Sequence, residues 1–325
     1  MPETLLTQRP LTGSHLKLIA LATMLVDHTG AVLFPQIALL RIIGRVSFPL
    51  YAFLAAEGCR YSRDRGRYAL RLGLFALVSE IPYDLALHPE FLERGQIGVS
   101  FLFQTNILYT LFFAAAGIHI FEVLRRRSWR AQLAALAGFG GVCLLSLLLN
   151  NLGRSAHGGT WLLYASNLVA LSYHPLLLWV CHLLEKRHGG REGAPGLLSN
   201  VLSAVPLLLA LLYASLYGAS YGPTAVLFIF LLYLAKTRRA QAGVMTLWVL
   251  YYYGWATWLG RVLIQHAAIP LSGALPRLCS ALAAAALVCF AYNGQRGKQV
   301  NKWVFYAVYP AHLLLLAALR AVLSR

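Results

Sequence analysis

The sequence contains little charge. Asp, Glu, Lys and Arg make up 12% of its 325 residues, against about 25% in an ordinary soluble domain. Hydrophobic residues account for 59% of the chain, and the mean hydropathy is +0.63. This composition excludes a disordered protein and a domain that binds nucleic acid. A soluble globule would also need more polar surface, so we expect the lipid bilayer to surround most of the chain.

Acidic residues and cysteine motifs are also scarce. The chain has 11 Asp and Glu against 28 Lys and Arg, a net charge of +17, and such an excess is typical of the cytoplasmic loops of membrane proteins. Its 5 cysteines form no CxxC pair and show no metal-ligand spacing. We therefore interpret them as small buried hydrophobes and expect neither a disulfide framework nor a metal site.

Apolar segments of roughly 20 residues, the length that crosses a bilayer, recur along the chain. They predict an all-α, polytopic integral membrane bundle with about eleven transmembrane helices. We expect a short cytoplasmic tail over residues 1–15 and a single membrane domain over residues 16–325. The predicted spans are 16–35, 37–57, 68–87, 101–123, 131–150, 160–183, 197–217, 220–235, 243–266, 273–292 and 303–323. Whether the short eighth and the polar ninth span cross completely is left open.

Basic residues gather in every second predicted loop. The basic loops contain Arg60 to Arg67, Arg125 to Arg130, Lys186 to Arg191, Lys236 to Arg239, and Arg296 to Lys302. Because Lys and Arg mark the cytoplasmic side, the N-terminus is predicted inside. With eleven spans the C-terminus is then outside, in a multi-pass protein.

Polar side chains inside the spans are the strongest functional signal, because an ionisable group in lipid needs a partner or a wet cavity. They are Asp27 and His28, Arg41 and Arg45, Glu80 and Asp84, Gln104 and Asn106, Arg261, and Tyr309 and His312. At ~1.5 Å per helical residue, those of the first four spans fall in the outer half of the membrane, and the last pair lies near its middle.

Helical spacing groups these residues further. Arg41 and Arg45 are four residues apart and share one helix face, as do Glu80 and Asp84. We expect the two pairs to neutralise each other across a helix interface, although the same pattern would also suit a purely structural salt-bridge cluster. A histidine among them, His28, is suited to act as a general base.

Several sequence segments, occurring in the same order along the chain, resemble segments of the TraX family. They are LVDHTG at 25–30, RIIGRVSFPLYAF at 41–53, SEIPYD at 79–84, QTN at 104–106, YNGQRGK at 292–298 and FYAVYPAH at 305–312. TraX-like proteins are bacterial inner-membrane proteins, and the name-giving member acetylates the N-terminal amine of a conjugative pilin. The family is similar to membrane acyltransferases that carry acetyl groups from cytoplasmic acetyl-CoA across the membrane.

The resemblance implies an acetyl-CoA-dependent acyltransferase with a periplasmic acceptor, the leading candidate being a pilin N-terminus. For the chemistry we expect His28 as the base, oriented by Glu80 or Asp84 in preference to Asp27. We expect Arg41 or Arg45, with the amides of Asn106 or Gln104, to stabilise the oxyanion. His312 and Tyr309 would lie where the thioester is presented.

Coenzyme A carries phosphates, which suit basic cytoplasmic loops. The candidate residues for binding it are Arg60, Arg63, Arg65, Arg67, Arg71, Tyr292, Asn293, Gly294, Arg296, Gly297, Lys298 and Tyr309. The alternative is that these loops only set the topology. Three other functions stay open: acetylation of a surface glycan or small molecule, a proton-coupled transporter or flippase, and a non-enzymatic pilus assembly factor.

Overall fold

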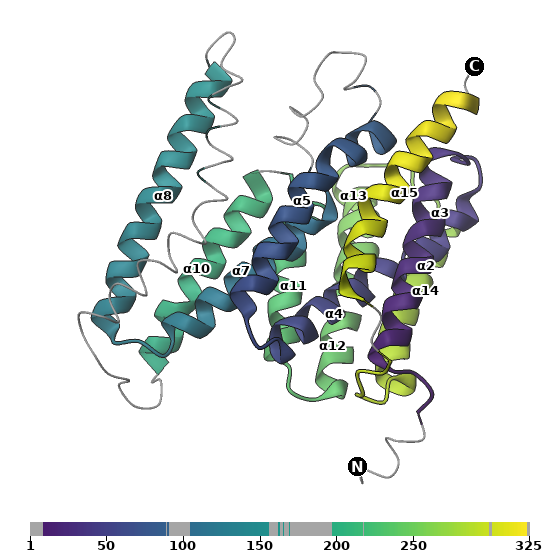
Figure 1. Cartoon of the computed structure of the whole chain (residues 1–325). Helices are drawn as coiled ribbons and strands as arrows, with labels where there is room; N and C mark the ends of the chain where they lie inside the picture. Colours follow the sequence, from purple (N-terminus) through teal and green to yellow (C-terminus); the bar gives the residue numbers. More distant parts are fainter. Residues whose placement is uncertain are drawn as a thin grey trace. The chain divides into compact units, whose positions relative to one another are not determined.

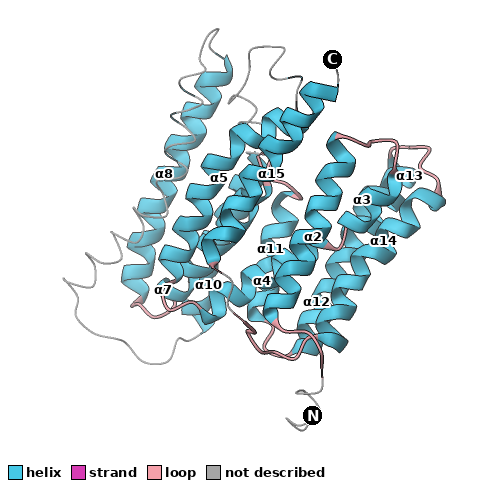
Figure 2. Cartoon of the chain, turned by 45° about the vertical axis from the view of Figure 1, so that its right-hand side comes forward, coloured by secondary structure: helices cyan, strands magenta, loops and turns pink. Residues whose placement is uncertain are grey.

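The computed structural model describes residues 9–88, 90, 105–155, 162, 165, 169, 197–216, 218–298 and 301–323. Within these ranges the chain forms helices and no β-strand, as Figures 1 and 2 show. The predicted all-α class is confirmed. Gln104 lies outside the described residues, as does the predicted span over residues 160–183 apart from residues 162, 165 and 169.

The chain is a membrane protein with several long apolar helices. By length and composition, the helices able to cross a bilayer in the described ranges are Ala38–Tyr61, Ile107–Leu124, Trp129–Gly153, Leu271–Ala291 and Trp303–Leu323. The helix Gly222–Leu234 is apolar but shorter; non-helical residues precede it at 218–221 and follow it at 235–237. The total of eleven spans stays a prediction.

The helices fall into two compact units. The first comprises Met1–Arg60, Val78–Ile97 and Leu231–Arg325, and the second comprises Tyr61–Leu77 and Gly98–Phe230. Helix α5 (Arg65–Leu87) runs through both sets of residues. We had expected one continuous membrane domain, and that expectation stays a prediction.

In the first unit, α2 (Gly13–Val32) packs against α3 (Ala38–Gly44) and α15 (Lys302–Leu323). Figure 2 shows α2 between these neighbours. Two glycines allow the close contact of α2 with α3, because a Cβ on Gly30 would strike Leu40 and one on Gly44 would strike Asp27. Small residues permit such close approach between membrane helices.

The second predicted span is interrupted. Helix α3 ends at Gly44, and α4 (Ser47–Tyr61) begins after Arg45 and Val46. The amide N–H groups of Arg45 and Val46 donate to the carbonyls of Ile42 and Ile43, at 3.1 and 3.3 Å. These short-range bonds make the tight turn that separates the two helices.

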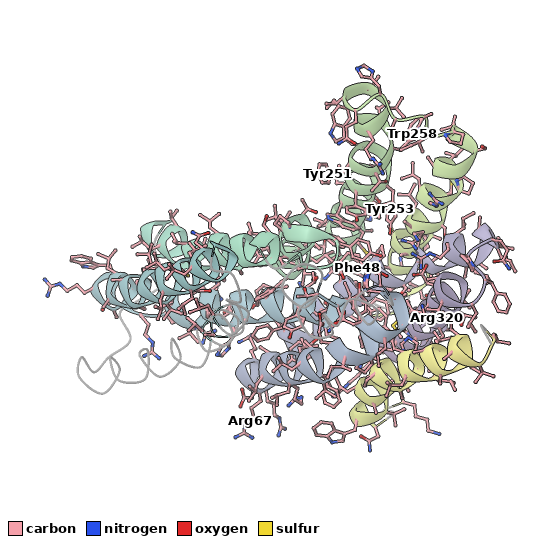
Figure 3. All side chains as sticks on the ribbon, turned by 90° about the horizontal axis from the view of Figure 1, so that it is seen from above. Phe48, Arg67, Tyr251, Tyr253, Trp258 and Arg320 are labelled. Carbon is pink, nitrogen blue, oxygen red and sulfur yellow. The ribbon has the colours of Figure 1, made fainter. Side chains whose placement is uncertain are left out.

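The ninth and tenth predicted spans contain π-helical turns. Helix α12 (Arg238–Val249) continues into η2 (Leu250–Leu259) and α13 (Gly260–Ile264), while α14 (Leu271–Ala286) continues into η3 (Leu287–Ala291). Tyr251, Tyr253 and Trp258 project from η2 in Figure 3. Helix α14 packs against α12, η2 and α3.

The second unit contains α7 (Ile107–Leu124), α8 (Trp129–Ser155), α10 (Leu197–Leu216) and most of α11 (Gly222–Leu234). Helix α10 packs against both α7 and α8. Almost every side chain of α7 is buried, so this apolar helix forms the core of its unit.

Candidate functional site

Asp27 joins two arginines in an ion-pair cluster within the first unit. Its Oδ2 lies 2.6 Å from Arg41 Nη1, and its Oδ1 lies 2.7 Å from Arg45 Nη2. Arg45 Nε also donates to the Arg41 carbonyl at 2.8 Å. Each arginine thus contacts one oxygen of the Asp27 carboxylate. Arg45 lies at the break between α3 and α4, where its guanidinium reaches both this carboxylate and the carbonyl of Arg41.

This arrangement corrects the expected pairing. We had matched Arg41 and Arg45 with Glu80 and Asp84, but the structure gives both arginines the carboxylate of Asp27, from α2. Glu80 and Asp84 are buried on α5. Helical spacing predicted correctly that each pair shares one face, but it says nothing about which helix lies opposite that face.

His28, the next residue of α2, forms a pair with His312 of α15. His28 Nδ1 lies 2.7 Å from His312 Nε2, and the two rings are parallel, with an interplanar angle of 2° and centroids 5.0 Å apart. His312 Nδ1 in turn lies 2.8 Å from the Val308 carbonyl oxygen. The Tyr309 ring meets both imidazoles edge-on, at 6.2 and 5.6 Å.

The expected orienting group for His28 was a carboxylate from the third span. Its Nδ1 partner is instead an imidazole, from a helix 284 residues further along the chain. His312 is 8% exposed and Tyr309 is 4% exposed, whereas His28 is half-buried, so the pair is open on the His28 side. The guanidiniums of Arg41 and Arg45 are near enough to act on His28 electrostatically.

The geometry combines the ingredients of proton transfer and charge stabilisation. A neutral imidazole pair can take up a proton from a reacting group. The neighbouring guanidiniums can stabilise negative charge that develops beside it. Arg41 is the more open of the two, with 35% of its side chain exposed against 15% for Arg45. Of the predicted catalytic residues, the structure thus brings together Asp27, His28, Arg41, Arg45 and His312.

Asn106 belongs to the second unit. It is fully buried as the N-cap of α7, where its Oδ1 accepts from the Leu108 N–H at 3.0 Å. Its Nδ2 donates to the Ala76 carbonyl at 2.8 Å. These bonds fix the start of α7 against α5. The expected role of Asn106 as an oxyanion donor stays a prediction.

Arg60, expected to bind coenzyme A, is occupied by the protein. Its Nη2 donates to the carbonyls of Leu232, Tyr233 and Ala235 at 3.1, 2.7 and 2.9 Å, and its Nη1 pairs with Glu57. The guanidinium therefore satisfies carbonyls at the C-terminal end of α11, which have no partner inside the helix. This geometry argues against a phosphate ligand at Arg60.

The other predicted arginines of that loop belong to the second unit. Arg63 and Arg67 are exposed, and Arg65 and Arg71 are half-buried. Arg67 pairs with Asp64 at 2.9 Å and keeps 80% of its side chain exposed; it points outward in Figure 3. Their binding to a donor substrate stays a prediction.

The predicted phosphate-binding turn, Tyr292 to Lys298, holds the start of α2. The carbonyls of Gln295 and Arg296 accept from the backbone N–H groups of Gly13 and Ser14 at 2.8 and 3.0 Å. Ser14 Oγ also donates to the Lys298 carbonyl at 2.6 Å. The turn thus fastens together two segments from opposite ends of the chain.

Local backbone geometry and packing explain why glycine occupies positions 294 and 297 of this turn. Gly294 and Gly297 have φ of +81° and +74°, a region that favours glycine. A Cβ on Gly294 would strike Arg238, whose guanidinium donates to the carbonyls of Tyr292 and Asn293 at 2.8 and 2.9 Å. The glycines therefore serve the fold, and phosphate binding by this turn stays a prediction.

Sequence reasoning overlooked Glu57. This carboxylate lies near the end of α4, where its Oε1 accepts from Gln241 Nε2 at 3.2 Å and pairs with Arg60. Its position inside a predicted apolar span was a signal that could have identified it. Among the described residues, no group of three or more His, Cys, Asp or Glu side chains is arranged to hold a metal ion.

Comparison with known proteins places these helices in context. A family model described as "TraX protein" matches residues 12–184. The chain is 30% identical over 94 residues to an uncharacterized protein of Rickettsia prowazekii (strain Madrid E), which covers 29% of this chain and 36% of that relative. It is 29% identical over 110 residues to "Probable fimbrial assembly protein FimC, serogroup H1" of Dichelobacter nodosus, covering 32% of this chain and 44% of that relative.

The matched stretches thus span less than half the length of either curated relative. No solved structure matches the chain. The family match contains α2 to α5, α7 and α8, with Asp27, His28, Arg41 and Arg45, whereas His312 lies beyond its end.

Proposed function

This chain belongs to the TraX family, and we propose that it is a membrane-embedded acetyltransferase that moves an acetyl group from cytoplasmic acetyl-CoA to a periplasmic acceptor. The observation that carries the proposal is the His28–His312 pair beside the Asp27–Arg41–Arg45 cluster. This is a base next to a cationic centre within the first unit, as acyl transfer requires.

In the proposed reaction, the acceptor amine or hydroxyl attacks the thioester carbonyl and gives its proton to His28. The new C–N or C–O bond forms, the carbon–sulfur bond breaks, and the proton passes to the thiolate to give free coenzyme A. Arg41 is proposed to stabilise the oxyanion, because its guanidinium is partly exposed while Asp27 holds it in place. The Arg45 guanidinium keeps that carboxylate oriented.

The proposed acceptor is the N-terminal amine of a pilin subunit. Support comes from the family and from the relative of Dichelobacter nodosus, whose printed name describes a probable fimbrial assembly protein. Acetylation of a surface glycan or small molecule is the alternative acceptor chemistry. The same printed name also favours a second function, a non-enzymatic assembly factor in which these charges only hold helices together.

We further propose a bacterial inner-membrane location with many spans, the N-terminus and basic loops in the cytoplasm, and the C-terminus outside. This orientation follows from the alternation of Lys and Arg between loops. It puts the donor at the basic side of the membrane and the acceptor at the opposite side.

Purified protein in liposomes, given labelled acetyl-CoA and a synthetic pilin N-terminal peptide, tests the proposal. We expect transfer of the label to the peptide, reduced roughly 10²-fold or more by His28→Gln, because a positioned base contributes about that factor. His266→Gln is the matched control, since His266 is exposed. Full transfer by His28→Gln would show that His28 is not the base. No transfer by the unaltered chain, with either peptide or glycan acceptors, would count against the enzyme and favour the assembly factor.

A further inference from the structure

The hydrogens of the two imidazoles can be assigned from their partners. His312 Nδ1 lies 2.8 Å from the carbonyl oxygen of Val308. A carbonyl oxygen only accepts hydrogen bonds, so Nδ1 of His312 must carry the hydrogen. A neutral imidazole has one N–H group, and Nε2 of His312 is therefore the acceptor in the pair.

The assignment for His312 also determines which nitrogen of His28 carries the hydrogen. Because His312 Nε2 accepts, the group that faces it at 2.7 Å, His28 Nδ1, must donate. Neutral His28 then has its hydrogen on Nδ1 and its lone pair on Nε2. The reverse arrangement would set the lone pairs of His312 Nδ1 and the Val308 carbonyl against each other in a buried place, which is unfavourable.

We infer that His312 is a positioning residue, which fixes the tautomer of His28 so that Nε2 of His28 is the base; this rests on the proposed acetyl transfer. When Nε2 takes a proton from the acceptor, the ring becomes a cation. Its Nδ1–H then makes a stronger, charge-assisted bond to His312. A third group that orients the base in this way recurs in nucleophilic catalysis.

Helix α15 provides all of the supporting contacts. Val308 accepts from the ring of His312 one helical turn later, and Tyr309 packs edge-on against both imidazoles. The two ring planes are parallel, with an interplanar angle of 2°, and the 2.7 Å between His28 Nδ1 and His312 Nε2 is a hydrogen-bond distance. Helix α15 therefore acts on the reaction through His28, and His312 itself does not touch the acceptor.

Two substitutions of similar size and polarity separate this role from mere packing. In His312→Gln, the amide oxygen reaches the place of Nε2 and still accepts from His28. In His312→Asn, the amide nitrogen reaches the place of Nδ1 and still donates to Val308, but nothing accepts from His28. We expect acetyl transfer within about tenfold of the unaltered chain for His312→Gln and a loss of roughly 10²-fold or more for His312→Asn.

Nitrogen-15 NMR of histidine-labelled protein gives a readout that does not depend on activity. The His28 signals are assigned by their loss in His28→Gln. We expect neutral His28 to be protonated at Nδ1 in the unaltered chain and in His312→Gln, and to lose this preference in His312→Asn. A His28 protonated at Nε2 in the unaltered chain would overturn the inference, as would equal rates for the two variants.

The two proposals can fail separately. If no variant transfers acetyl groups but His28 is protonated at Nδ1 and depends on His312, the proposed enzyme function fails while the tautomer assignment holds. If transfer occurs and the tautomer is the opposite one, the enzyme function holds and the role of His312 is wrong.

Discussion

Gly44 lies directly against the side chain of Asp27. A Cβ on residue 44 would overlap with the carboxyl group of Asp27, which Arg41 and Arg45 hold from two sides. The missing side chain therefore lets α3 approach α2 closely enough for the ion-pair cluster to form. Gly44, the last residue of α3, is therefore needed for helix packing.

Gly44→Ala is expected to destabilise the protein by about 1–3 kcal/mol, because the ion-paired carboxylate cannot move aside freely. Gly243→Ala in α12 is the control, since a Cβ there meets nothing within 4 Å and Ala favours a helix by about 0.5–1 kcal/mol. Thermal unfolding in detergent measures both changes. Equal stability of the two variants would contradict the close contact.

Asp27→Asn should destabilise the chain by about 2 kcal/mol or more, because it leaves two guanidiniums without their carboxylate. This loss of stability is smaller than that for breaking a fully buried ion pair, because 35% of the Arg41 side chain is exposed. Asp64→Asn is the control: its partner Arg67 is 80% exposed, so a change within about 1 kcal/mol is expected. Denaturation in mixed micelles would show the difference, and similar losses would argue against the cluster.

Arg320 fastens α15 to α5 within the first unit. Its Nη1 and Nη2 donate to the carbonyls of Ala86 and Leu85 at 3.0 and 2.8 Å, and Figure 3 labels its position on α15. Arg320→Ala should lower the free energy of unfolding by about 1–2 kcal/mol, since bonds from a charged donor are lost. Arg277→Ala, at an exposed position, should change it little. A smaller effect at Arg320 than at Arg277 would refute this anchoring.

The proposed orientation predicts which side of the membrane each loop faces. Cys279 is exposed, contrary to the expectation that the cysteines are buried. With Cys279 replaced by Ser, Arg67→Cys should react with a membrane-impermeant thiol reagent in inside-out vesicles. Gln36→Cys, in a predicted outer loop, should react in right-side-out vesicles. The chain with only Cys279→Ser measures the background. Labelling of both positions from one side would show that the span count or the orientation is wrong.

The sequence predicted the fold more completely than it predicted the site. Hydropathy located the helices where the structure describes them, but it missed the turn at Arg45 and Val46, because that turn is made by backbone hydrogen bonds, which hydropathy does not report. The polar residues inside spans were identified correctly as unusual. Their partners were not: Asp27 takes both arginines, and His28 meets His312.

The sequence by itself determined that this is an all-α membrane protein, because the composition leaves too little polar surface for water. It also determined which polar groups need partners in the membrane. Only the tertiary structure decided which side chains are the partners of these polar groups. The His28–His312 contact joins residues 284 positions apart, and the turn at Gly294 to Gly297 holds the start of α2. Helical periodicity fixes which residues share a face, whereas helix packing decides which faces meet.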